Sequence, residues 1–477
     1  MSTIYSARWV LPISSIPIDD GAVAIEGTKI VAVGPKAEVV TRFPDAQAFD
    51  FGEAAILPGL VNTHSHLELT VMRGFLESEE HDFFAWLRRL TLARIATTDD
   101  ELRISATCGA IEAARAGITC VGDSSSLASE TLKALREVGL RGVVYQESFG
   151  PDPILASENV AKLNGQIANA QRLENNLLQT GVSPHAPYTV TGLQLELISR
   201  MAIDQKLPLM MHAAESKAEA LFMQKGNGPF ADGLRKRGIE WKAPGTSSLE
   251  CLLRHGVLDT KPLLAHCITV DDADLELIQQ SGAGVAHCPK SNAKLGHGRA
   301  AFAKFVSKEI NVGLGSDSVA SNNTCDLLEE ARFATLLARL DLGTSPRVSR
   351  GSGISVRSDQ AGALPDSRAG APIEADTALS AATLGGAHAL QLDDQIGALA
   401  EGMQADITIV RLDGVHQQPI HNPFDALIFS SSGRDVVMTM VAGKEIYREG
   451  QILAVNEKEL RQQLAAVRCK VESAPFA

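Results

Sequence analysis

The sequence predicts an α/β protein that consists of a (β/α)8 TIM barrel and a small β-sandwich domain formed by both chain termini. Two observations predict this fold class. Short apolar runs alternate with amphipathic segments through the middle of the chain, whereas strand-like runs with glycine turns occupy both ends. With 477 residues, the chain is long enough for a barrel of about 250 residues and one smaller domain.

The apolar runs of the middle region are expected to be parallel strands, because each is short, continuous and followed by a helical pattern. Acidic residues at 99–101 open one such helix, and apolar residues recur at helical spacing over 193–202. Eight strand–helix units favour a closed barrel over an open sheet. The predicted strands are 55–62, 118–123, 142–147, 180–185, 207–212, 262–266, 283–287 and 312–317.

The two ends of the chain share a different pattern of short antiparallel strands and tight turns. The short apolar runs at 22–25 and 29–33 are similar in pattern to those at 405–410 and 436–446. We therefore predict a composite β-sandwich domain, with the barrel between its two halves. The predicted boundaries are 1–57 and 391–477 for the sandwich domain and 58–390 for the barrel.

One segment interrupts the barrel pattern. Residues 343–376 are rich in Gly, Ser, Pro, Arg and Ala and lack periodicity, and they separate predicted helices at 327–340 and 378–390. We interpret this segment as a long mobile surface loop, with a functional lid as the alternative.

Composition excludes several classes of protein. The net charge of −13 argues against a nucleic-acid partner, which requires a concentrated positive field. The seven cysteines are scattered and form no C-x-x-C pair, so we expect reduced thiols and neither disulfides nor a cysteine zinc site. Without a signal peptide or an apolar stretch of membrane-spanning length, we expect a soluble cytoplasmic protein with no membrane partner.

Histidines and one aspartate close most of the predicted barrel strands, where parallel barrels build their active sites. A single histidine at a strand end is commonly structural. Recurrence on five strands, with an aspartate closing the eighth, makes chance a poor explanation. These residues are His64 and His66, His185, His212, His266, His287 and Asp317.

Four of these residues are predicted to bind one divalent metal ion: His64, His66, His212 and Asp317. Residues i and i+2 of a strand point the same way, and the first, fifth and eighth strands can surround one point near the barrel axis. Three imidazoles and a carboxylate suit Zn²⁺, with Fe²⁺ as the alternative. A bound ion would lower the pKa of its water from about 15.7 to near 7. A single ion per subunit is expected, because no lysine ends the fourth strand to bridge two.

Three further residues are placed beside this ion. Glu215 follows the ligand His212 by three residues and can shuttle a proton; the alternative is an acid at a helix N-terminus. His266 is placed to hold the attacking water or to polarise the group under attack, and His185 to contact substrate.

Seven short motifs together resemble the amidohydrolase superfamily, in its mononuclear deaminase and chlorohydrolase branch. They are PGLVNTHSH (58–66), SPHAPY (183–188), HAAE (212–215), AHC (265–267), HCPKSN (287–292), GSDSVASN (315–322) and AD (405–406). The resemblance implies the four metal ligands above and catalytic roles for Glu215, His266 and Asp317. It also implies hydrolytic release of ammonia from a small amino-heterocycle, and we expect a homodimer because dimers are common for this type.

Three stretches most resemble the aminodeoxyfutalosine deaminases of menaquinone synthesis: HLELT (66–70), FFAWLRR (83–89) and KSNAKLGHG (290–298). The next resemblance is to S-adenosylhomocysteine and methylthioadenosine deaminases, which carry a ribose-binding Glu directly before the Trp. Ala85 stands there in this chain, and Glu68 is the alternative ribose ligand. A substrate carboxylate would be met by Arg73, Arg88 or Arg89. The predicted substrate contacts are His185, Glu68, Trp86, Arg88, Ser291 and Asn292.

Other functions stay open on the same site: an adenosine- or guanine-type deaminase, a triazine chlorohydrolase or a cyclic amidohydrolase. A non-catalytic relative is disfavoured by the intact ligand set and Glu215. The unrelated zinc nucleobase deaminases share H-x-E, which His66-Leu-Glu68 matches, but their P-C-x-x-C signature is missing.

Overall fold

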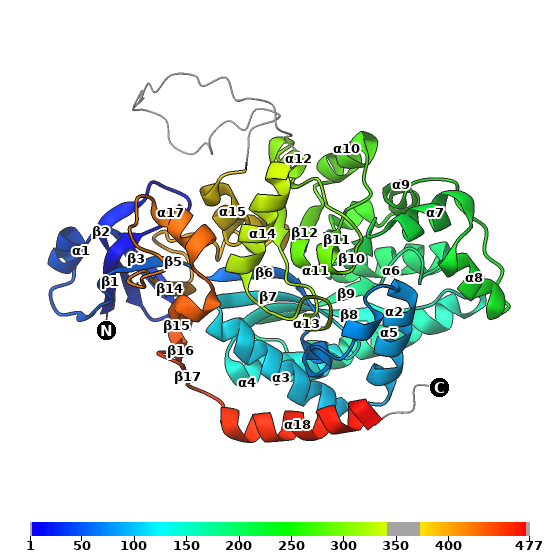
Figure 1. Cartoon of the computed structure of the whole chain (residues 1–477), viewed down its shortest axis with the longest axis horizontal. Coiled ribbons are helices and arrows are strands. Elements are labelled where there is room, and N and C mark those ends of the chain that lie inside the picture. The colour runs from blue at the N-terminus through cyan, green and yellow to red at the C-terminus, as the bar shows by residue number, and fades with distance from the viewer. Residues whose placement is uncertain (1, 341–372, 474–477) are drawn as a thin grey trace.

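The computed structural model describes residues 2–340 and 373–473, and its central feature is the predicted barrel (Figure 1). Two parallel four-stranded sheets, β6-β7-β8-β9 and β10-β11-β12-β13, form its wall. Parallel bridges Ser65–Asp317 and Val182–Leu209 join the two sheets at both seams, so the barrel closes. The strands are β6 (Leu60–Ser65), β7 (Ile118–Ser125), β8 (Arg141–Ser148), β9 (Leu178–Pro184), β10 (Met210–Ala213), β11 (Leu263–His266), β12 (Gly284–His287) and β13 (Val312–Leu314).

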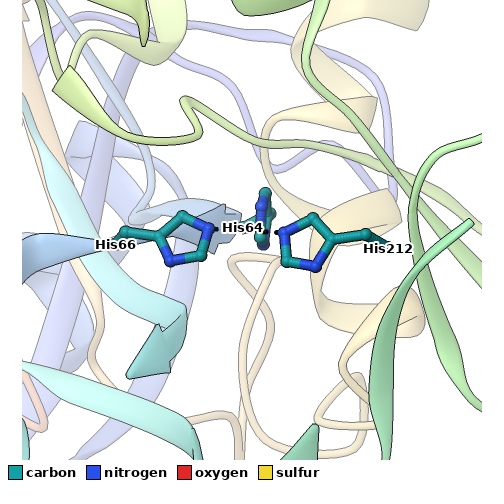
Figure 2. Close-up of side chains that lie close together, drawn as sticks. All are labelled: His64, His66 and His212. Carbon is teal, nitrogen blue, oxygen red and sulfur yellow. Dashed lines mark hydrogen bonds between the residues drawn. The ribbon is translucent and has the colours of Figure 1, made fainter. Parts of the chain in front are cut away.

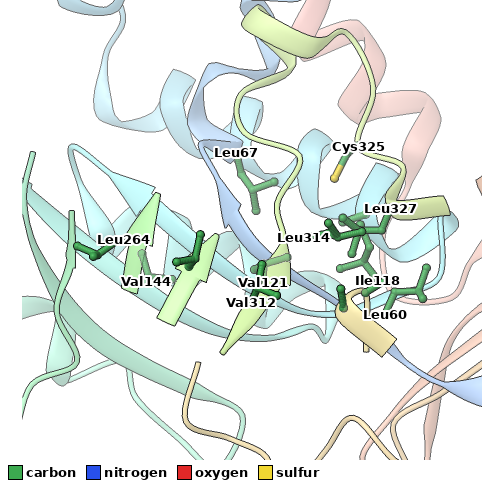
Figure 3. Packing of buried hydrophobic residues seen from close by; sticks show 14 of the residues in the cluster. Leu60, Leu67, Ile118, Val121, Val144, Leu264, Val312, Leu314, Cys325 and Leu327 are labelled. Atoms are coloured by element: carbon green, nitrogen blue, oxygen red, sulfur yellow. The ribbon is translucent and has the colours of Figure 1, made fainter. Parts of the chain in front are cut away.

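Alternate residues of the barrel strands enter two separate apolar clusters, as the period of a strand requires. Cys120 and Val143 belong to the cluster inside the barrel. Their neighbours Val121 and Val144 belong to the larger cluster between barrel and helices, which also contains Leu327 (Figure 3).

The barrel helices follow their strands, and local sequence explains where they begin. Thr98 caps α3: its Oγ1 accepts a hydrogen bond from the Glu101 amide, and the Glu101 carboxylate accepts one from the Thr98 amide. The helix predicted at 193–202 is α6. The principal helices are α2 (Phe83–Ile95), α3 (Asp99–Arg115), α4 (Ala128–Val138), α5 (Ala156–Gln171), α6 (Gly192–Gln205), α7 (Lys217–Lys225), α8 (Pro229–Lys236), α9 (Ser248–Arg254), α10 (Asp272–Ser281), α11 (Pro289–Lys294), α12 (Phe302–Ser307), α13 (Val319–Asn322) and α14 (Leu327–Leu340).

The helix predicted at 378–390 is wrong in detail, because two short helices replace it: α15 (Ala375–Ala381) and α16 (Leu384–Ala389). The interruption lies at Ala382, whose carbonyl accepts a hydrogen bond from the Val61 amide of β6. Most of the predicted loop, 343–372, lies outside the described residues; Ile373 beyond it is buried.

Both ends of the chain contribute to a second, nine-stranded sheet of order β17-β16-β15-β14-β5-β1-β2-β3, with β4 beside β1. Val23, Ile56, Ile409 and Met438 are among the residues of its shared apolar core, so strands from the two termini pack on one another as the predicted sandwich requires. The strands are β1 (Ser2–Val10), β2 (Ile18–Glu26), β3 (Lys29–Pro35), β4 (Gln47–Asp50), β5 (Ala54–Pro58), β14 (Ile407–Arg411), β15 (Val436–Val441), β16 (Lys444–Arg448) and β17 (Gln451–Ile452).

The strand predicted at 55–62 is in fact two strands. β5 pairs with β14 in the terminal sheet, whereas β6 pairs with β7 in the barrel. Gly59 separates them, and a Cβ at this position would lie 2.0 Å from Thr119 Oγ1. The chain therefore passes from one sheet to the other where only glycine fits.

Helix α18 (Glu457–Ser473) runs along the barrel beside α3 (Figure 1). Its Val467 and Val471 pack against Leu69 and Met72 of the 3-10 helix η1 (Leu67–Met72), which directly follows His66. The boundaries 1–57, 58–390 and 391–477 stay a prediction. Among the described residues, no helix is long and apolar enough to cross a membrane.

Candidate active site

Three imidazoles and one carboxylate meet at the carboxyl end of the barrel. The Nε2 atoms of His66 and His212 are 3.3 Å apart, and the rings of His64, His66 and His212 point toward one another (Figure 2). Oδ1 of Asp317 lies 3.5 Å from Nε2 of His64 and 3.6 Å from Nε2 of His66. Ligand atoms around a tetrahedral zinc ion with bonds of 2.0–2.1 Å are about 3.3 Å apart. The distances between His66 and His212 and from Asp317 to His64 and His66 are close to this value, and the ligand atoms of the three imidazoles all lie within 4.8 Å of one another.

The state of His64 also fits a metal ligand. Its side chain is fully buried, and neither ring nitrogen has a hydrogen-bond partner among the described residues. Burial lowers the pKa of His64, and burial together with His64 lowers the pKa of His66 to about 3. Neutral imidazoles are the form that binds metal, and an ion would satisfy nitrogens that are otherwise left without a partner.

Asp317 is held so that one oxygen faces the imidazoles. Its Oδ2 accepts hydrogen bonds from the hydroxyls of Ser291 (2.5 Å) and Ser321 (2.9 Å), which leaves Oδ1 toward His64. Burial opposes ionisation, yet interactions with His64, His266 and His66 hold the pKa of Asp317 well below its usual range.

The backbone around Asp317 is strained in the way that functional sites often are. Asp317 has a φ of 55°, and its amide donates to the His64 carbonyl at 2.9 Å. The approach of β13 to β6 needs Gly315, where a Cβ would lie 2.9 Å from both Cys288 Sγ and His64 Cβ.

Glu215 lies beside the imidazole cluster with three polar neighbours. The Tyr188 hydroxyl donates to its Oε2 at 3.1 Å, and its Oε1 lies 3.7 Å from Nε2 of His266 and 3.6 Å from Nε2 of His297. The side chain is buried. A carboxylate in this setting can take up and release a proton near the metal ligands.

The alternative role of Glu215, an acid at a helix N-terminus, belongs to another residue. Helix α7 begins at Lys217 with Ser216 as its cap, and the acid of its first turn is Glu219. Both oxygens of Glu219 accept backbone hydrogen bonds at 2.8 Å, from the amides of Ala214 and Glu215. Glu219 thus fixes the turn that presents Glu215.

His266 and His185 flank the same space. Nδ1 of His266 lies 2.8 Å from Oδ1 of Asn292, which orients the ring so that Nε2 faces Glu215. Nδ1 of His185 lies 2.9 Å from the Thr189 hydroxyl, and its ring centroid is 4.7 Å from that of His212. Burial lowers the pKa of His185 to about 3, so this ring is neutral.

Three predicted substrate contacts have hydrogen-bond partners within the protein, and their contact with substrate stays a prediction. Ser291 supports Asp317, and Asn292 orients His266. Glu68 accepts hydrogen bonds from the Ser125 hydroxyl (2.8 Å) and the Ser126 amide (3.1 Å) with its two oxygens. All three side chains therefore have hydrogen-bond partners inside the protein.

The predicted contacts on α2 lie at different depths. Trp86 is buried in the apolar cluster of Leu69 and Met72, whereas Phe83 on the same helix makes an edge contact with His297 at 4.5 Å. Arg88 is exposed. Substrate contact by Trp86 and Arg88 stays a prediction. The two alternatives to Arg88 form ion pairs, Arg73 with Glu112 and Arg89 with Glu79.

Three residues at the candidate site were not singled out from the sequence: Asp123, Glu147 and His297. Oδ2 of Asp123 accepts hydrogen bonds from the Ser65 hydroxyl (2.8 Å) and the Leu67 amide (2.7 Å), and so anchors the segment around His66. Burial and nearby carboxylates raise the pKa of Glu147 to about 8. Asp123 ends the second predicted strand and Glu147 the third. Asp317 was predicted as a site residue because it ends the eighth strand in the same way.

Comparison with known proteins places this geometry in a family. Residues 55–446 match the amidohydrolase family, and residues 21–46 match an imidazolonepropionase-like composite domain of bacteria. The 5-methylthioadenosine/S-adenosylhomocysteine deaminase 1 of Syntrophus aciditrophicus is 30% identical over 461 residues, covering 95% of this chain and 93% of that protein. The corresponding deaminase of Pyrococcus furiosus is 28% identical, covering 97% of this chain and 98% of that protein.

Solved structures agree with the fold. The crystal structure of an adenosine deaminase from Xanthomonas campestris with bound zinc has a TM-score of 0.83 and 27% identity, covering 99% of this chain and 98% of that one. An atrazine chlorohydrolase from Arthrobacter aurescens complexed with zinc has a TM-score of 0.79 at 22% identity and covers 98% of this chain and all of its own (100%). The chain therefore belongs to the amidohydrolase family, in its branch of metal-dependent deaminases and chlorohydrolases, and is a hydrolase of carbon–nitrogen bonds other than peptide bonds.

Proposed function

We propose that the chain is a zinc-dependent deaminase that hydrolyses the exocyclic amino group of an aminopurine nucleoside and releases ammonia. The position of Glu215 carries this proposal, since its carboxylate lies between Tyr188, His266 and His297 beside the metal ligands. The names of the most similar relatives, which are nucleoside deaminases, support the substrate class.

In such a reaction, different side chains carry out the individual proton transfers. A divalent ion, when bound, supplies Lewis acidity that brings the pKa of water at the site from about 15.7 to near 7. Oδ1 of Asp317 accepts the proton of the attacking water, because Oδ2 is held by two hydroxyls. Glu215 protonates the ring nitrogen next to the amino-bearing carbon, which makes that carbon electrophilic. His266, oriented by Asn292, stabilises the oxygen as it adds. Glu215, now ionised, takes the proton of the new hydroxyl group and passes it to the leaving amine, which gives a ring carbonyl and ammonia. The proton held by Asp317 then passes to Glu215 and restores both carboxyl groups to their starting states.

Aminodeoxyfutalosine is our first candidate substrate, which would place the enzyme in menaquinone synthesis. The resemblance of residues 66–70, 83–89 and 290–298 supports it, as does Ala85 at the position where relatives acting on S-adenosylhomocysteine carry a ribose-binding Glu. Methylthioadenosine, S-adenosylhomocysteine and adenosine are the second candidates, favoured by the relatives' names.

An ammonia-release assay of the zinc-loaded protein tests the proposal. The panel comprises aminodeoxyfutalosine, adenosine, methylthioadenosine, S-adenosylhomocysteine, guanine and a chlorotriazine. We expect ammonia from a purine nucleoside, and Glu215→Gln should retain zinc while kcat falls by about 10² or more. Glu158→Gln, at an exposed position of α5, is the matched control. Chloride release from the triazine as the main activity, or a near-normal rate for Glu215→Gln, would contradict the proposal.

A further inference from the structure

One carboxylate at the site has no role in the chemistry above. Glu147 lies near the carboxyl end of β8, and one of its oxygens is within 4.8 Å of ring nitrogens of His185 and His212. Its Oε1 is shielded from solvent and has no hydrogen-bond partner within residues 2–340 and 373–473. An unsatisfied carboxylate is costly to bury, so this position suggests a partner that the chain itself does not supply.

A second metal ion is a poor partner for Glu147. Among the described residues, the side chains that could share an ion with Glu147 are His185 and His212. Both nitrogens of His212 are engaged, because Nδ1 lies 2.9 Å from the His185 carbonyl oxygen and Nε2 belongs to the cluster with His66. A second ion would therefore retain two protein ligands, fewer than the three of a typical catalytic zinc site.

A hydroxyl-bearing part of the substrate fits better. Glu215 and His266 stand on the β10 and β11 side of the site, where the amino-bearing carbon must lie. Glu147 and His185 come from β8 and β9, on the other side of His212. Whatever is attached to the base extends toward this pair, and two adjacent carboxylate oxygens can accept hydrogen bonds from two neighbouring hydroxyls.

Glu68, the carboxylate that sequence suggests for this role, is already satisfied by Ser125 and Ser126. Ala85 has no polar side chain. We propose that Glu147 is the specificity-determining residue that binds the vicinal hydroxyls of the substrate's sugar, an inference that rests on the proposed deamination of a purine nucleoside.

The test compares a ribonucleoside substrate with its 2′,3′-dideoxy analogue. The wild type should favour the diol in kcat/KM by about 10- to 100-fold, because the analogue leaves the buried Glu147 carboxyl group without a hydrogen-bond partner. Glu147→Ala should reduce this ratio to near one by slowing only the diol, and the near-isosteric Glu147→Gln should retain part of it. Glu68→Gln is the matched control, expected to affect both compounds by the same factor.

Each outcome has a separate meaning. An unchanged ratio in Glu147→Ala would overturn the proposal, and so would two zinc equivalents in the wild type that fall to one in that variant. Absence of ammonia from every nucleoside would refute the deaminase function. In that case, binding measurements test the role of Glu147. The wild type should bind inosine more tightly than 2′,3′-dideoxyinosine by the same factor of about 10 to 100. In Glu147→Ala the ratio of the two dissociation constants should be near one.

Discussion

At the scale of single residues, the hydroxyls around Asp317 determine which of its oxygens can bind a metal. Because Ser291 and Ser321 both donate to Oδ2, Oδ1 is directed toward the imidazoles. We expect Ser321→Ala to weaken zinc binding by about 10- to 100-fold, as loss of an outer-shell partner typically does. Competition with a chromogenic chelator measures this affinity. Ser157→Ala, at an exposed site, is the control, and equal affinities of the two variants would contradict the prediction.

Buried Glu330 should make stability depend on pH. Its oxygens accept hydrogen bonds from Asn322 Nδ2 (2.6 Å) and the Lys290 amide (3.2 Å). Burial raises its pKa from 4.5 to about 8, although Lys290 acts in the opposite direction. Between these values the folded chain keeps a proton that the unfolded chain has lost, so stability falls as pH rises, by about 1.4 kcal/mol per pH unit.

Glu330→Gln removes this titration. In urea unfolding at pH 5, 6, 7 and 8, the free energy of unfolding of the wild type should therefore decline relative to that of the variant. The difference should stop changing above the folded pKa, and parallel curves over the whole range would show that Glu330 ionises normally.

At the scale of elements, one buried ion pair fastens the barrel to the terminal sheet. Arg141 at the start of β8 donates to both oxygens of Asp406, at 2.9 and 3.1 Å, and Asp406 directly precedes β14. Exposed fractions of 4% and 1% for the two side chains show how fully the pair is desolvated.

Removing one partner should leave an uncompensated buried charge. We expect Arg141→Ala or Asp406→Ala to lower the free energy of unfolding by about 3–5 kcal/mol, and the double variant Arg141→Met/Asp406→Leu to lose less than either. Chemical denaturation measures all three. A double variant as unstable as the sum of the single ones would mean that the pair is not coupled.

Elements were predictable from sequence where one local signal sufficed. Apolar runs located the eight barrel strands, and the polar residues that end them located the imidazole cluster, because each feature lies within a few residues. The division of 55–62 into β5 and β6 was not predictable, since residues buried in either sheet are equally apolar. The break between α15 and α16 depends on a contact with Val61, more than 300 residues away in sequence.

The same distinction applies to the polar residues at the site. Sequence places Ser291 and Asn292 just after His287, which ends the seventh predicted strand, but does not reveal which way their side chains point. Their partners, Asp317 and His266, are each 26 residues distant. Asp406 is part of only a weak motif in the sequence, and its role emerges only with Arg141. The same types of polar residue can hold a neighbouring side chain in place or contact substrate. Only their partners in the folded structure distinguish the two roles.

At the scale of the whole molecule, the metal site lies where distant parts of the chain meet. β6 and β13 close the barrel at the Ser65–Asp317 bridge, between the ligands of the first and eighth barrel strands. Behind this seam, η1 carries Leu69 and Met72 against Val467 and Val471 of α18. The C-terminal helix therefore covers the segment that follows His66, and the ligands depend on the folded state of nearly the entire chain.

Because the unfolded chain does not assemble these ligands, zinc should stabilise the whole protein. Free zinc at 100 times its dissociation constant contributes about 2.7 kcal/mol by mass action. We expect zinc to raise the Tm of the metal-free protein and a chelator to reverse the rise, measured by scanning calorimetry at fixed protein concentration.

In His64→Ala the zinc-dependent rise should disappear. The metal-free variant should lose little stability, because the ring that it removes has two unpaired buried nitrogens. His416→Ala, at an exposed histidine paired with Asp435, should keep the full rise. An undiminished rise in His64→Ala would mean that zinc stabilises the chain from another site.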